Sequence, residues 1–173
     1  MPTKDWIRFH YRDQPKDLQE MLCNEYQCED ISVLLRYVRK YPISYTLHAR
    51  IADYYWDAGR KRIAIKKWFE TVKLFPMIAN PYFQRAHWAI NTRNFVDTAK
   101  YLELCLRFDN GYFKETAHFW RAESLFQIGS YSAAKRELEN VRDDFQEMYF
   151  LDYKQRSKAD ILNDINSAKP NNA

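Results

Sequence analysis

One stretch of 34 residues, 45–78, constrains the fold more than any other part of the chain, because it reads as a complete pair of helices. Apolar residues recur with helical spacing on both sides of Gly59, which supplies the break that a turn needs. Pro76 ends the second run, since proline cannot continue a helix. A pair of this kind buries its apolar sides by stacking against neighbouring pairs, so the chain should contain further copies of the pattern.

The same pattern recurs at steps of about 34 residues along the chain. Pro42 lies 34 residues before Pro76 and ends an equivalent helical run, and Gly129 provides another turn glycine further on. The last predicted helix has one apolar and one polar side, as a terminal cap would. We therefore expect a single all-α domain over residues 1–173. Its predicted parts are a degenerate repeat over 11–44, repeats over 45–78, 79–114 and 115–148, a capping helix over 149–165 and a frayed tail over 166–173.

Residues 45–145 resemble tetratricopeptide repeats, and weaker similarity covers about 11–165. In the first complete repeat the matching residues are Ile51, Ala52, Tyr55, Gly59, Ala64, Trp68 and Pro76. In the last repeat they are Ala122, Leu125, Gly129, Tyr131, Ala134, Leu138 and Val141. The middle repeat matches at Tyr82, Ala86, Phe95, Leu102 and Asp109-Asn110, and carries Arg93 where the others have the turn glycine. The resemblance implies a right-handed α-solenoid of three to four antiparallel helix pairs, closed by a C-terminal capping helix.

The sequence contains no recognisable catalytic motif. Three glycines in 173 residues leave little material for a phosphate-binding loop, and the common nucleotide, metalloprotease and serine-hydrolase motifs are absent. Cys23, Cys28 and His10 are too loosely spaced for a zinc site and lack a fourth ligand. We therefore expect a protein that is not an enzyme and that binds no metal or cofactor.

The beginning of the chain lacks the apolar segment of a signal peptide, and no stretch is apolar for the length that a membrane-spanning helix requires. Three cysteines do not make a disulfide framework. These features predict a cytoplasmic protein without membrane insertion.

The resemblance also implies where a partner would bind. In tetratricopeptide proteins, certain positions on the first helix of each pair line a concave groove that holds a peptide or a partner helix. Carried over by phase, these positions are Ala49, Asp53, Trp56 and Asp57, then Phe83, His87, Ile90 and Asn91, then Phe119, Glu123, Phe126 and Gln127. This set is aromatic and mildly acidic, which suits a protein-binding surface. It predicts an adaptor or a chaperone-like protein, of which an immunity or antitoxin protein that blocks a toxin would be a special form.

Two alternatives stay open at this point. Some of the groove aromatics would belong to the core if one end of the chain fills the groove.

A basic cluster on the second helix of the first complete repeat would instead suit a nucleic-acid-binding regulator, with Trp56 and Trp68 nearby for base stacking. The simpler explanation of that cluster is a solvated outer face, and the net charge of +4 is a weak indication of a polyanionic partner. Its members are Arg60, Lys61, Arg62, Lys66, Lys67 and Lys73. Self-association through exposed aromatics is a further possibility.

Overall fold

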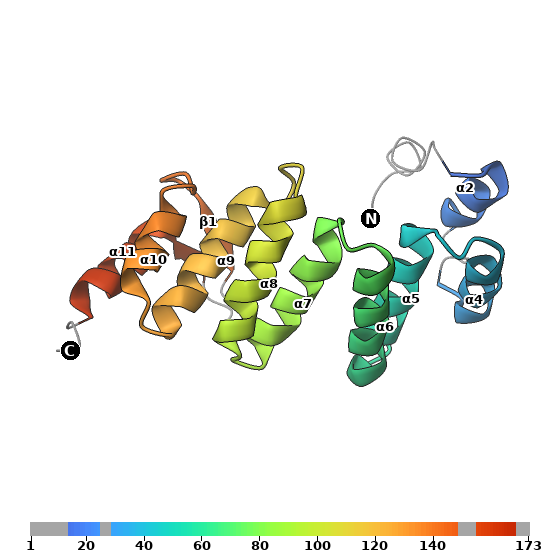
Figure 1. Ribbon diagram of the computed structural model, residues 1–173, viewed down its shortest axis with the longest axis horizontal. Coiled ribbons are helices and arrows are strands. Elements are labelled where there is room, and N and C mark those ends of the chain that lie inside the picture. Colours follow the sequence, from blue (N-terminus) through green and yellow to red (C-terminus); the bar gives the residue numbers. More distant parts are fainter. Residues whose placement is uncertain (1–13, 25–28, 149–154, 169–173) are drawn as a thin grey trace. The chain divides into compact units, whose positions relative to one another are not determined.

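The computed structural model of the protein describes residues 14–24, 29–148 and 155–168 (Figure 1). Within these ranges the chain forms nine helices and one two-stranded sheet, so the expected all-α class is confirmed, with a small strand pair in addition. The chain divides into two compact units, Met1–Pro76 and Met77–Ala173. The expectation of one domain over 1–173 stays a prediction, and each unit is described by itself.

The first unit contains four helices in its described part: α2 (Lys16–Leu22), α4 (Ile31–Lys40), α5 (Tyr45–Asp57) and α6 (Lys61–Leu74). Helix α4 begins at Ile31 because the Asp30 carboxylate accepts a hydrogen bond from the backbone N–H of Ser32 at 2.8 Å. Helices α2, α4 and α5 share one core, whose fully buried members are Leu18, Met21, Leu22, Leu34, Leu47 and Ile51. A second, smaller cluster of Ala49, Ala52 and Trp68 joins α5 to α6.

The second unit contains two helix pairs and a C-terminal segment. Helix α7 (Ala79–Asn91) packs on α8 (Phe95–Phe108), α8 packs on α9 (Lys114–Gln127), and α9 packs on α10 (Tyr131–Leu138). Strand β1 (Gln146–Met148) pairs antiparallel with β2 (Gln155–Ser157), placing Gln146 opposite Ser157. Helix α11 (Lys158–Ser167) follows β2 directly and also contacts α9. The core of this unit includes Ala86, Leu102, Phe119, Trp120, Ala122, Leu138, Ile161 and Ile165.

Three helices end in the same backbone turn. Gly59, Arg93 and Gly129 follow α5, α7 and α9, with φ of 73°, 57° and 78°. In each turn this residue donates its N–H to the carbonyl three residues earlier, and the next residue donates to the carbonyl five residues earlier. This bonding defines the Schellman motif, which satisfies the last carbonyls of a helix. Arg93 adopts the left-handed conformation that the glycines adopt more easily.

The predicted capping helix over 149–165 is wrong in its beginning and in its end. Helix α11 begins only at Lys158 and continues to Ser167, and β2 precedes it. The start is set by a capping box, in which the side chains of Ser157 and Asp160 each accept a hydrogen bond from the other's backbone N–H, at 3.2 and 2.8 Å. Residues 149–154 of the predicted helix and 169–173 of the predicted tail lie outside the described residues.

No helix in the described ranges combines the length and the apolar character needed to cross a membrane.

Candidate functional site

A cavity lies beside helix α5 in the first unit, where the sequence predicted groove residues. Its volume is about 320 Å³, and two of the predicted residues, Asp53 and Asp57, line it. The other lining residues are Glu29, Arg50, Tyr54 and Ala58. We call this the α5 cavity. Three carboxylates and one guanidinium give it a net acidic lining, and Tyr54 supplies an aromatic wall.

Asp53 is the electrostatically unusual residue of the α5 cavity. The pKa of Asp53 is raised from 3.8 to about 6, with burial as the largest cause; Arg50 lowers it and the neighbouring Asp57 raises it by smaller amounts. A carboxylate held in this way retains unfavourable desolvation energy in the folded protein, so a cation placed near it would be stabilised.

The two remaining predicted residues of α5 have different surroundings. Ala49 is buried against Ala52 and Trp68, so it belongs to the core and not to an open groove. Trp56 is partly buried, and the ammonium of Lys61 lies 5.4 Å from the centre of its ring.

The predicted groove residues of α7 are mostly committed to packing within the second unit. Phe83 stacks on Phe113 and Trp120, with ring centres 4.4 and 4.9 Å away. His87 lies 5.9 Å from the Trp120 ring, and burial lowers its pKa. Ile90 is fully buried.

Of the α7 set, Asn91 alone is exposed, and its amide donates to the backbone carbonyl of His87 at 2.8 Å. The position of these four residues in the repeat predicted that all of them line a groove. In the structure, the Phe113 and Trp120 rings cover most of this face of α7.

Two of the four predicted groove residues of α9, Phe119 and Glu123, are covered by the C-terminal part of the chain. Phe119 is 1% exposed and packs on Phe145, with ring centres 5.4 Å apart. Glu123 is also 1% exposed, and its carboxylate lies 3.2 Å from the guanidinium of Arg156 in β2. At Phe119 and Glu123 the structure agrees with the alternative in which groove positions belong to the core.

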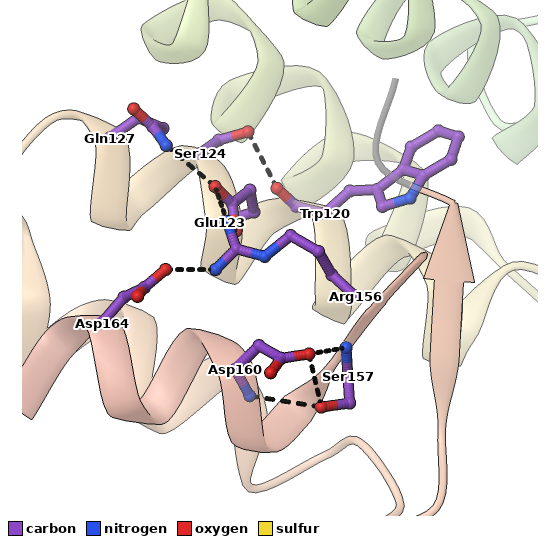
Figure 2. Close-up of polar contacts among 8 residues, drawn as sticks. All are labelled: Trp120, Glu123, Ser124, Gln127, Arg156, Ser157, Asp160 and Asp164. Carbon is purple, nitrogen blue, oxygen red and sulfur yellow. Dashed lines mark hydrogen bonds and ion pairs between the residues drawn. The ribbon is translucent and has the colours of Figure 1, made fainter. Parts of the chain in front are cut away.

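Figure 2 shows how the Arg156 guanidinium lies between α9 and α11. One of its nitrogens contacts Glu123, and the other contacts Asp164 of α11. The Gln127 amide donates to the same Glu123 carboxylate at 2.9 Å and so helps to orient it. We call Glu123, Gln127, Arg156 and Asp164 the arginine clasp.

Of the other two predicted groove residues of α9, Phe126 is partly buried and lies 5.9 Å from the Tyr131 ring, whereas Gln127 is exposed. Arg156 was not among the residues predicted from the sequence, because β2 lies outside the helical repeats from which the groove positions were predicted. The sequence held one indication of this contact. Glu123 is a charged residue among apolar helix positions, and a buried glutamate is usually paired with a basic side chain of the same chain.

The basic cluster on α6 is largely solvent-exposed. Lys67 pairs with Glu70 at 2.8 Å, while the other five members are exposed. Trp68 is 4% exposed, so its ring cannot stack on a base as the nucleic-acid alternative required.

No three His, Cys, Asp or Glu side chains in residues 14–24, 29–148 and 155–168 are grouped as a metal site would need. His10 and Cys28, which entered the zinc hypothesis, lie outside these ranges.

No family model matches the chain, and no curated protein matches it at a significant level.

Proposed function

We propose that the protein is a non-enzymatic protein-binding module, adaptor-like or chaperone-like, that holds a basic segment of a partner protein in the α5 cavity. The observation that carries this proposal is the cavity of about 320 Å³ with Asp53 and Asp57 in its wall. A volume of this order accommodates one or two side chains rather than a whole helix. The desolvated Asp53 carboxylate favours a lysine or arginine over a neutral side chain.

The repeating turns support a tetratricopeptide-like array of helix pairs as the scaffold of this module. Gly59 and Arg93 are 34 residues apart, and Arg93 and Gly129 are 36 apart, with the same hydrogen bonds at each turn. In such an array the first helices of successive pairs would present one side to a partner, as α5 presents Asp53 and Asp57.

The test compares binding by three double variants of the full chain. A partner is captured from lysate with and without nuclease treatment, and the basic segments of a protein that is captured in both cases are synthesised as labelled peptides. Asp53→Asn with Asp57→Asn should weaken peptide binding by about tenfold or more, since two charge interactions are lost. Glu20→Gln with Glu139→Gln removes two exposed carboxylates elsewhere and should leave binding unchanged.

Unchanged binding by the Asp53 and Asp57 variant would remove the α5 cavity from the interface. A toxin as the captured partner would identify the immunity or antitoxin form of this function.

A nucleic-acid-binding regulator is the second candidate, favoured by one observation. Arg62, Lys66, Phe69 and Lys73 recur at intervals of four, three and four residues along α6, and all four are exposed. Basic and aromatic residues on one helical stripe suit a single-stranded nucleic acid. In the same assay, Lys66→Glu with Lys73→Glu distinguishes the candidates. Loss of binding in that variant alone, together with loss of the partner on nuclease treatment, would favour the nucleic acid.

A further inference from the structure

The C-terminal segment Gln155–Ser167 lies where the sequence placed a ligand-binding face. It buries Glu123 of α9 and pairs the carboxylate with Arg156. Phe119 of the same predicted set lies in one core with Ile161 and Ile165 of α11. We propose that this face of α9 is a second binding site, occupied in the resting protein by the chain's own C-terminal segment, and that an extended partner segment bearing an arginine displaces it. This goes beyond the proposed function, which concerns α5.

The arginine clasp defines the chemistry of the incoming segment. Glu123 is buried and is approached by Arg156 at 3.2 Å and by Gln127 at 2.9 Å, so it recognises a planar hydrogen-bond donor that carries a positive charge. Arg156 reaches this carboxylate from a three-residue strand, β2. A competing ligand therefore requires an arginine on extended backbone.

The C-terminal segment is held by few apolar anchors. Helix α11 contributes two buried residues, Ile161 and Ile165, whereas α9 contributes six. Leu162 adds a partly buried apolar contact, and further side-chain contacts of the segment are polar. Lys158 donates to the Val141 carbonyl and pairs with Asp143, each at 2.8 Å, and the Asp143 side chain is 96% exposed. Exposed pairs of this kind contribute little to stability.

The segment also carries its own helix start, since the capping box of Ser157 and Asp160 lies entirely within it. Once released, it needs no other part of the chain to begin α11. A segment with few anchors and local structure of its own opens at lower free energy than the helices it covers.

The first experiment uses the full chain and a fluorescein-labelled peptide with the sequence of residues 155–167 as the probe. Fluorescence anisotropy should show that the Arg156→Gln variant binds this peptide at least about tenfold more tightly than the wild type, because its internal competitor has lost the arginine. A peptide with glutamine in place of its arginine should show no such gain. Arg136→Gln, which changes an exposed arginine on α10, is the matched control and should behave as the wild type.

Native-state hydrogen exchange of the wild type is the second experiment, and it does not depend on how the variant folds. Amides of α11 should exchange at least about tenfold faster than those of α9, and excess unlabelled peptide should accelerate α11 further. Equal peptide affinities of a folded Arg156→Gln variant and the wild type would overturn the proposal, as would exchange of α11 at the rate of α9. A doubled molecular mass of the wild type on light scattering, abolished by Arg156→Gln, would assign the face to a second copy and overturn it too. Peptide affinity and hydrogen exchange of α9 and α11 depend only on the second unit. They would therefore be unchanged if the α5 cavity proved not to bind a partner.

Discussion

The buried carboxylate of Glu123 and the partly buried carboxylate of Asp53 are compensated in opposite ways. Glu123 has a cationic partner inside the chain, since its carboxylate lies 3.2 Å from Arg156 and accepts a hydrogen bond from Gln127 at 2.9 Å. Asp53 faces the α5 cavity with its pKa raised to about 6, because desolvation outweighs the attraction of Arg50. Under the proposed function, this difference would let one carboxylate stabilise a contact within the chain while the other binds an external cation.

Stability should therefore depend on pH through Asp53. Its pKa is about 6 in the folded protein and about 3.8 unfolded, so the folded state binds more protons between these values and the free energy of unfolding falls as pH rises through that window. Asp53→Asn should raise the free energy of unfolding at pH 7 by about 1–3 kcal/mol and flatten its pH dependence between about 4 and 6. Urea denaturation at pH 4.5 and pH 7 measures both effects. Asp57→Asn should reduce this slope only in part, because Asp57 is the smaller of the two causes that raise the pKa of Asp53.

Breaking the arginine clasp from one side should be costly. Arg156→Met leaves Glu123 buried without its cationic partner, and we expect a loss of about 3 kcal/mol in the free energy of unfolding. Combining it with Glu123→Leu should recover most of that loss, since no charge then remains buried. A double-mutant cycle in urea measures the coupling, and a single Arg156→Met variant as stable as the wild type would contradict the buried pairing.

At the scale of the elements, the three Schellman turns have the same backbone conformation but differ in the residue with positive φ, which is Gly59, Arg93 or Gly129. No atom lies within 4 Å of a Cβ built on Gly59 or Gly129, so only their backbone conformation disfavours a side chain. Arg93 adopts that conformation with its side chain in place. The middle turn is thus the weakest of the three.

Exchanging these residues should change stability in opposite directions. Gly59→Ala and Gly129→Ala should each lower the free energy of unfolding by about 1 kcal/mol, and Arg93→Gly should raise it by about 0.5–1 kcal/mol. Thermal denaturation followed by circular dichroism compares them directly. An unchanged midpoint for Arg93→Gly would mean that interactions of its side chain offset the strain.

The helix pairs were predictable from sequence because their signals are local. Glycine and proline mark the ends of α5 and α6, and apolar spacing within each helix reports its buried side. The C-terminal segment was not predictable in this way. Its two short strands form by pairing with each other, as Gln146 does with Ser157, and they lack the regular apolar spacing that marks the helices. The candidate site shows the same division. Sequence phase found Asp53 and Asp57, whereas the cover over Glu123 comes from a residue 33 positions away.

At the scale of the whole molecule, the two compact units have separate cores. Leu47 is fully buried in the first and Leu102 in the second. The most extensive contacts between helices in the described ranges join sequence neighbours, whereas α11 on α9 joins elements that are further apart in sequence. Each unit therefore has its own cooperative network of apolar contacts.

Core truncations should report this division. Leu47→Ala and Leu102→Ala should each cost about 2–5 kcal/mol, because each leaves a cavity at a fully buried position. Hydrogen exchange followed by mass spectrometry should show faster exchange in the unit that carries the substitution and unchanged exchange in the other. Val96→Ala, at a side chain that is 63% exposed, is the control and should stay within about 0.5 kcal/mol of the wild type. Equal acceleration in both units would show that they unfold as one.

The long sequence separation within the arginine clasp has a consequence during synthesis. Glu123 leaves the ribosome 33 residues before Arg156, and at about 5–20 residues per second that interval lasts about 2–7 seconds. Helix α9 can pair with α8 and α10 in that time, while the side that carries Phe119 and Glu123 has no cover. The nascent chain therefore offers this face to other molecules before its own C-terminus exists to compete for it.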